Sequence, residues 1–231
     1  MKHSIVIIAL LFCTHLTFAQ IHEFGVVLGG SNFIGDVGST KYIAPKNLAF
    51  GGIYKWNRSP RHSFRFSALF TQLEGKDGDS DDISRKLRGY EFTNDIIELS
   101  LGMEFTFFDF DLHRPGPKST PYLYTGATVA FHDNFFFNPS NGQLTDEKTS
   151  SQAWGIPAVI GYKTTITDNI ILAFEIGARY TFSDELDGSV PDTKENIEDF
   201  SFGNINNNDW YMFTGITLTY TFGRNPCYCN F

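Results

Sequence analysis

The chain has 231 residues, with 18 Lys and Arg against 26 Asp and Glu, and a formal net charge of −8. Nucleic-acid binding requires clustered basic residues, so an acidic chain without a basic tract is not expected to have a nucleic-acid partner. Aromatic residues make up 16% of the chain, which excludes disorder over most of its length. The 24 Phe and 21 Gly in a chain that is only 19% charged favour β-structure with one apolar face and one face of small or polar residues.

The first nineteen residues form a separate unit. A short basic start at residues 1–3 precedes an apolar stretch from residue 5 to residue 18, and Thr17 and Ala19 occupy the positions that a signal peptidase reads. The stretch is shorter than the roughly 18 residues that a membrane-spanning helix needs. We therefore expect residues 1–19 to be a cleaved secretory signal, residues 20–223 to be the folded domain and residues 224–231 to be a short tail.

Eight runs of alternating apolar and polar residues follow, at residues 23–30, 48–56, 62–73, 92–108, 122–131, 153–166, 170–182 and 210–222. An alternation with a period of two is typical of strands rather than helices. Several runs have about ten residues, the length that a tilted strand needs to cross a bilayer. The pattern predicts an all-β fold, an eight-stranded antiparallel up-and-down transmembrane β-barrel.

The connections between these runs alternate in length. Residues 31–47, 74–91, 132–152 and 183–209 are long, residues 57–61 and 167–169 are short, and residues 109–121 are intermediate. Barrels of the bacterial cell outer membrane have short periplasmic turns and longer external loops. A soluble barrel has no reason to show this alternation, so we expect an outer-membrane barrel with both termini in the periplasm.

The two faces of the strands differ in the same way. One face carries Trp56, Trp154, Trp210 and many Phe, Tyr and Leu, too much bulk for the narrow interior of an eight-stranded barrel. The other face carries glycines and eight charged residues, which are Glu23, Lys55, Arg65, Glu98, Glu104, Lys163, Glu175 and Arg179. We expect the charged face to line the lumen, with acids and bases paired because an isolated buried charge is costly.

Aromatic residues near the strand ends predict the two interfacial belts of a membrane barrel. The expected periplasmic belt consists of Trp56, Phe64, Phe107, Tyr162, Tyr220 and Phe222, and the outer belt of Trp154, Phe182 and Trp210.

Residue pairs that could support catalysis are poorly placed for it. Glu98 and Glu104 are six residues apart, about 20 Å along one strand, which is too far for paired acid–base catalysis. His132 and Asp133 adjoin in sequence, which does not make a catalytic triad. No glycine-rich phosphate loop or zinc-ligand spacing is present. We expect no enzyme activity and no cofactor, while a lipid-modifying enzyme stays open as an alternative.

Two acidic segments are candidates for divalent-cation binding. Residues 77–82 begin like a calcium-binding loop, but Asp82 and Arg88 stand where that loop needs Gly and Glu. Residues 183–209 hold eight acids and one base. We expect both segments to be hydrated loops, with weak divalent binding by the second as the alternative.

Two segments at the expected periplasmic end are candidates for partner contact. Residues 109–121 form a proline-rich turn that is longer than a tight hairpin needs, and it contains His113 and Arg114. Cys227 and Cys229 follow the last strand, and a disulfide between residues this close would be strained. Either segment contacts a partner, or the turn is an ordinary one and the cysteines are incidental in a frayed tail.

Three short segments carry a resemblance to a known family. The sequences GGSNFIGDVG at residues 29–38, YIAP at 42–45 and RGYEF at 88–92, followed by Ile97 and Glu98, are similar to those of an outer-membrane β-barrel family of Bacteroidetes that includes PorG of the type IX secretion system. The resemblance implies that Gly29, Gly30, Gly35 and Gly38 shape the first outer loop. It also implies a non-enzymatic barrel, surrounded by outer-membrane lipids, that tethers a periplasmic ring of the lipoprotein PorK and of PorN. An OmpX-like barrel whose outer loops bind ligands or surfaces is the alternative.

Overall fold

The computed structural model of the chain describes residues 21–114, 116–204 and 208–223. These residues form eight strands, which are β1 (Ile21–Ile34), β2 (Asn47–Asn57), β3 (His62–Lys76), β4 (Glu91–Thr106), β5 (Ser119–Phe137), β6 (Leu144–Thr165), β7 (Ile170–Thr181) and β8 (Trp210–Phe222). They also form the short helices η2 (Asp77–Asp79), α2 (Ile83–Arg88) and α3 (Lys194–Phe200). None of the helices in this described part of the chain is long and apolar enough to cross a membrane. The predicted signal, Cys227 and Cys229 lie outside the described residues.

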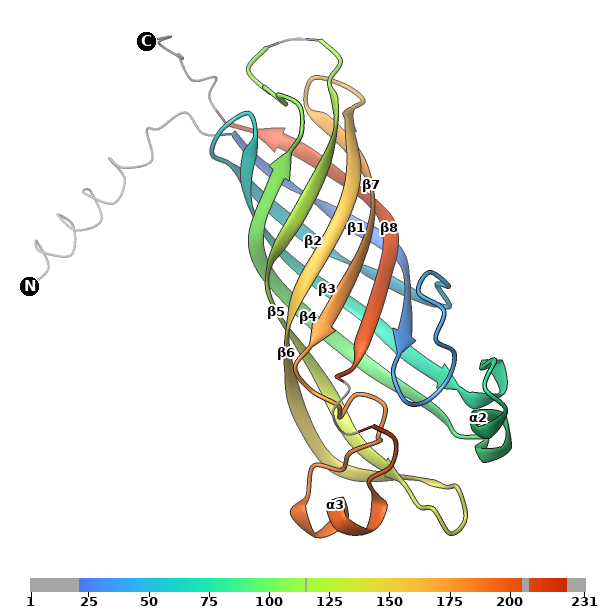
Figure 1. Cartoon of the computed structure of the whole chain (residues 1–231). Helices are drawn as coiled ribbons and strands as arrows, with labels where there is room; N and C mark the ends of the chain where they lie inside the picture. Colours follow the sequence, from blue (N-terminus) through green and yellow to red (C-terminus); the bar gives the residue numbers. More distant parts are fainter. Residues whose placement is uncertain (1–20, 115, 205–207, 224–231) are drawn as a thin grey trace, which may run out of the picture.

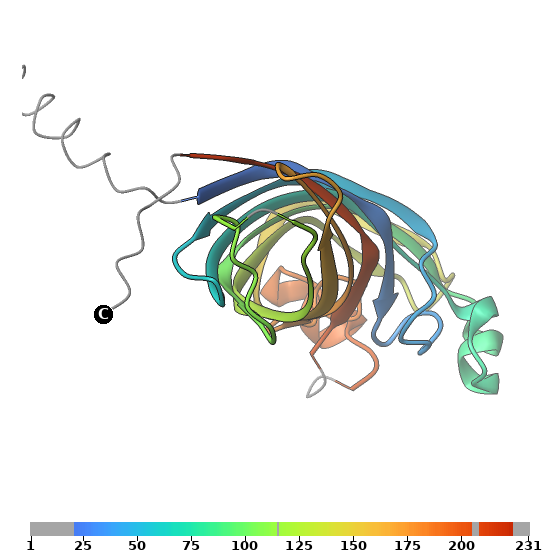
Figure 2. The same cartoon turned by 90° about the horizontal axis from the view of Figure 1, so that it is seen from above.

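The strands follow one another in chain order around a closed barrel, in which β8 pairs with β1 (Figure 1). Every neighbouring pair of strands is antiparallel. Figure 2 shows the same barrel from above, as a ring of strands. The predicted fold class, an eight-stranded antiparallel up-and-down barrel, is confirmed.

The alternation in sequence becomes an apolar exterior and an ionic interior. Phe24, Leu101 and Ile160 point outward and are 58–63% exposed, whereas Lys55 and Arg65 point inward and are at most 1% exposed. A soluble barrel would have the opposite arrangement, so this exterior faces hydrocarbon. Closed antiparallel barrels with an apolar outer band are the spanning structures of bacterial outer membranes, and the short turns identify the end that carries Ile21 and Phe222 as periplasmic.

Outward-facing aromatic side chains gather near both ends of the strands. At the periplasmic end, Phe64, Phe107, Tyr162, Tyr220 and Phe222 are 43–55% exposed. At the outer end, Trp154 and Phe182 are each 57% exposed, and Trp210 packs edge-on against Tyr180 at 4.7 Å between ring centroids. These positions match the predicted interfacial belts, and Trp56, the remaining predicted member, is half-buried and packs against Phe64 at 5.4 Å between ring centroids.

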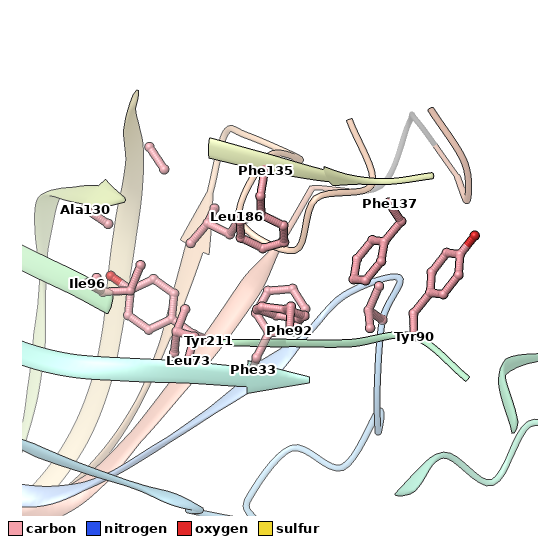
Figure 3. Close-up of a cluster of buried hydrophobic side chains, with 12 residues drawn as sticks. Phe33, Leu73, Tyr90, Phe92, Ile96, Ala130, Phe135, Phe137, Leu186 and Tyr211 are labelled. Carbon is pink, nitrogen blue, oxygen red and sulfur yellow. The ribbon is translucent and has the colours of Figure 1, made fainter. Parts of the chain in front are cut away.

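An apolar core fills the outer mouth of the barrel (Figure 3). It consists of Phe33, Val37, Leu73, Tyr90, Phe92, Ile96, Ala130, Phe135, Phe137, Ala153, Leu186 and Tyr211, all at most 8% exposed. Strand ends supply most of these side chains, and the β7–β8 connection adds Leu186. Loop and wall are therefore packed together, so the outer end is closed by a plug with a hydrophobic centre.

The prediction of a long loop at residues 132–152 is wrong over most of its length. β5 continues to Phe137 and β6 begins at Leu144, so the two strands project beyond the barrel as a hairpin (Figure 1). The extension is stable because its aromatic side chains find partners in other segments. Phe137 stacks on Tyr90 at 4.3 Å between ring centroids, and Phe136 stacks on Phe200 of α3 at 4.6 Å.

Truncation of Phe137 to Ala is expected to weaken the outer plug by about 3 kcal/mol, because the residue is 1% exposed and its loss leaves a cavity. Amide hydrogen exchange of the β5–β6 hairpin should become faster, while exchange in the membrane-spanning strands stays slow. Thr145→Ala on the same hairpin is the matched control, because Thr145 is exposed. Equal exchange rates for the two variants would contradict the packing role of Phe137.

Candidate functional site

Ionic networks inside the lumen link strands that are not neighbours in the barrel wall. Glu104 of β4 receives the ammonium groups of Lys55 from β2 and Lys163 from β6, with N–O distances of 2.7 and 2.6 Å. All three side chains are at most 1% exposed. One carboxylate therefore pairs with two buried cations that come from strands on different sides of the lumen.

A second network joins β3, β5 and β7. The Arg65 guanidinium donates two parallel hydrogen bonds to Glu175, at 2.7 and 2.9 Å, a geometry that strengthens an ion pair. The Tyr122 hydroxyl donates to the same carboxylate at 2.7 Å, and the ring of Tyr124 lies 4.5 Å from the Arg65 guanidinium carbon.

A third network lies nearer the outer mouth. The Arg179 Nε donates to Glu98 at 3.1 Å, and the Tyr211 hydroxyl donates to the same carboxylate at 2.6 Å. Glu98 and Glu104 thus belong to separate networks with different partners, each arranged to neutralise a buried cation.

Seven of the eight charged residues predicted for the lumen are joined in ion pairs, and Glu23 differs. Within the described residues Glu23 has no cationic partner within 4.0 Å; it accepts hydrogen bonds from Asn57 and Thr219, both at 2.9 Å. The equal numbers of acids and bases therefore do not pair one to one, because Glu104 takes two lysines. The networks fill the lumen and tie non-adjacent strands together.

The periplasmic end carries a polar cavity of about 390 Å³. It lies between the β4–β5 turn, the β6–β7 turn and the seam of β1 and β8, and its lining includes His113, Arg114, Lys118, Asp168 and Asn169. The structure thus places both of the predicted partner-contact residues of the long turn at one opening.

The β4–β5 turn is held in shape by its own hydrogen bonds. Asp111 accepts from the backbone N–H of His113 at 3.0 Å and pairs with the Arg114 guanidinium at 3.1 Å. The Lys118 ammonium donates to the carbonyls of Arg114 and Gly116. Arg114 remains 79% exposed, and partial burial lowers the pKa of His113 although Asp111 raises it. The turn therefore presents a cationic side chain to the periplasm from an ordered base.

Acidic side chains gather in the outer plug, which the sequence did not predict. Asp187 and Asp209 are fully buried, so the expectation of a hydrated loop at residues 183–209 is wrong at these positions. Asp187 accepts from the backbone N–H groups of Asp36, Val37 and Ser189 at 2.8–3.0 Å. Where loops cross without strand pairing, their buried backbone N–H groups need another acceptor, and this carboxylate supplies it. No local sequence motif predicts this role of Asp187.

The acidic segment at residues 77–82 behaves in the same way at Asp77. Asp77 is fully buried, pairs with Arg88 at 2.7 Å and accepts from the backbone N–H groups of Gly38 and Tyr90. It thereby joins the β1–β2 and β3–β4 connections. Within the described residues no group of three or more His, Cys, Asp or Glu is arranged to hold a metal ion.

Several solved outer-membrane barrels share the architecture. Ail, the attachment invasion locus protein of Yersinia pestis, crystallised with the heparin analogue sucrose octasulfate, is 9% identical with a TM-score of 0.48, over 89% of this chain and 100% of Ail. The N-terminal barrel domain of Pseudomonas aeruginosa OprF is 12% identical with a TM-score of 0.43, over 88% and 98% of the two chains. Neisserial surface protein A is 10% identical with a TM-score of 0.44, over 88% and 97%.

These likenesses assign neither an activity nor a partner. No curated protein matches the chain. A family model described as "Domain of unknown function (DUF6089)" matches residues 2–231, nearly the whole length. The chain therefore belongs to the DUF6089 family.

Proposed function

We propose that the protein is a non-enzymatic outer-membrane scaffold whose periplasmic end docks a partner, and that this partner is the PorK and PorN ring of the type IX secretion system. The cavity at the periplasmic end, with Arg114 exposed on an ordered turn, is the observation that supports docking there. The interior networks support a structural role, because their carboxylates are committed to buried cations. The resemblance of residues 29–45 and 88–98 to the PorG-containing family supports the identity of the partner.

Site-specific photo-crosslinking in cells tests this function. A photoreactive amino acid at Arg114 should give a crosslinked product that contains PorK or PorN, and one at Asp168, which lines the same cavity, should do so too. The same group at Ser140, in the exposed turn of the β5–β6 hairpin at the opposite end, is the control and should not. Capture of no ring protein from Arg114 or Asp168 would remove the scaffold proposal.

Ligand binding by the outer loops is the second candidate function, and one feature favours it. A polar cavity of about 490 Å³ lies beside the β5–β6 hairpin, and its lining includes Asp95, Asp133, Asp146, Lys148 and Asn134. Such a set of hydrogen-bonding groups suits a hydroxyl-rich surface ligand. A crosslink from Lys148 to a surface component, with none from Arg114, would favour this candidate over the scaffold.

A further inference from the structure

The β1–β2 connection folds back along the outside of the barrel wall. Asn32 lies on the outward face of β1, yet it is only 6% exposed. Its amide donates to the carbonyls of Lys41 and Tyr42 at 3.0 and 3.1 Å, and its side-chain oxygen accepts from the backbone N–H of Ala44 at 3.3 Å. Residues 41–44 are therefore fastened to the outer surface of β1 rather than placed over the mouth.

The next two residues of the connection, Pro45 and Lys46, also lie close to β1. Pro45 packs on Gly30, where a Cβ would lie 2.6 Å from the Pro45 Cβ. The backbone N–H of Lys46 donates to the Ser31 carbonyl at 2.9 Å. A side chain at position 30 would push the connection away from the wall, so glycine is required there for this packing.

The β3–β4 connection is tied to the same segment. Arg85 of α2 donates to the carbonyls of Gly35 and Gly38 at 2.9 and 3.0 Å, and Lys46 forms an ion pair with Asp79. Figures 1 and 2 show both connections on one side of the barrel, with α2 outside the ring of strands. We call residues 39–46 together with α2 the flap.

The flap exposes four large apolar side chains. Tyr42 and Ile43 are 68% and 58% exposed, and Ile83 and Leu87 are 73% and 84% exposed. Ile83 and Leu87 are four residues apart and share one face of α2. Exposed Lys41 precedes Tyr42 and exposed Lys86 precedes Leu87, while the exposed acids Asp81 and Asp82 precede Ile83 at the start of α2. Tyrosine and lysine beside aliphatic residues are the side chains that proteins use at a membrane–water interface.

The height of the flap agrees with that composition. Trp210 of the outer aromatic belt is the register partner of Ile34 on the adjacent strand β1. Asn32 and Gly30, which hold residues 41–45, lie two and four residues from Ile34 toward the membrane centre. The apolar residues of the connection therefore lie outside the wall at the level of the belt, where the lipid interface begins.

We propose that the flap rests on the outer leaflet, with Tyr42, Ile43, Ile83 and Leu87 inserted into the lipid interface. The occupant of this surface is lipid, because residues 41–45 lie lateral to the wall at belt height, and α2, which is tied to the same connection through Arg85, exposes its apolar side chains outside the ring of strands. The site is independent of the periplasmic end and of the scaffold proposal. It would anchor the rotation and depth of the barrel in the membrane.

Depth-dependent quenching tests the proposal on the whole chain. With Cys13, Cys227 and Cys229 replaced by Ser, an NBD label is placed at L87C, and at S140C as the matched control on an outer turn away from the wall. In phosphatidylcholine vesicles that contain brominated acyl chains, emission from position 87 should fall about twofold, as for an interfacial segment. Emission from position 140 should not change, and aqueous iodide should quench it more strongly than emission from position 87.

A variant that lacks the Asn32 hydrogen bonds tests whether the lipid contact of the flap depends on its attachment to β1. Asn32→Ala removes the three hydrogen bonds that hold residues 41–44, so a label at I43C should lose most of its quenching by brominated lipid while the barrel stays folded, as shown by its heat-modified gel mobility. Equal iodide access at positions 87 and 140 would refute the proposal. Protection of position 87 without lipid quenching, together with crosslinks between two copies or to another protein, would assign the surface to a protein contact and would refute it equally.

Discussion

Glu104→Leu is expected to destabilise the barrel by about 3–5 kcal/mol, because it leaves Lys55 and Lys163 buried without their shared anion. Urea unfolding of the protein in phospholipid vesicles, followed by tryptophan fluorescence, measures the change. The loss should exceed that of any single substitution on the lipid-facing surface, because two charges lose their partner at once.

Two variants show whether the loss arises from the cations. Glu23→Gln is the matched control: Glu23 is equally buried but accepts hydrogen bonds from Asn57 and Thr219, so its replacement should cost about 1 kcal/mol. The triple change E104L/K55M/K163M removes the cations as well and should recover most of the stability. If the triple variant is as unstable as Glu104→Leu alone, the lumen charges are not the reason for the loss.

Raising the pH from 5 to 9 is expected to loosen the outer plug. Burial, with repulsion from Asp187 and Asp36, raises the pKa of Asp184 to about 8. Burial, with repulsion from Asp187 and Asp184, raises the pKa of Asp209 well above its ordinary value. Because the folded plug binds protons that the unfolded loop releases near pH 4, its stability is greatest in acid and falls as the pH rises through 8. The Arg85 guanidinium, 3.9 Å from Asp36, offsets only part of this repulsion.

Protease digestion of residues 183–209 against pH measures this effect. Cleavage of the natural chain should be slow at pH 5 and should accelerate toward pH 9, whereas membrane-spanning strands stay protected. Asp209→Asn keeps the acceptor for the backbone N–H of Leu186 and removes one ionisation, so its pH dependence should be flatter. Glu195→Gln, an exposed change in α3, is the control. A cleavage rate that does not depend on pH would show that these carboxyls are not held protonated.

The barrel could be predicted from the sequence because its two faces meet different solvents. Phe24, Leu101 and Ile160 must face hydrocarbon, and Lys55 and Arg65 must avoid it. Each strand therefore shows the same alternation of apolar and polar residues in its sequence. The even number of strands and the alternating loop lengths then predicted which end of the barrel carries both termini and faces the periplasm.

The same reasoning failed where burial comes from contacts between loops. Phe135, Phe136 and Phe137 are consecutive and all buried, so they carry no alternation, and the strand extension depends on Tyr90 and Phe200 from other segments. Identifying the partners of Glu104 required knowing which strands face each other across the lumen. Asp187 and Asp209 look like ordinary loop acids in sequence, because Asp187 caps Asp36 and Val37 of the distant β1–β2 connection and Asp209 caps Leu186, 23 residues earlier in its own connection.

The filled lumen also prevents the barrel from acting as a channel. Charged networks occupy the periplasmic and central parts of the interior, and the aromatic plug seals the rest, so the protein should carry no measurable ionic current when incorporated into a planar bilayer. A secreted polypeptide could not thread through such a solid cylinder. Any export that depended on this protein would have to take a route outside its lumen.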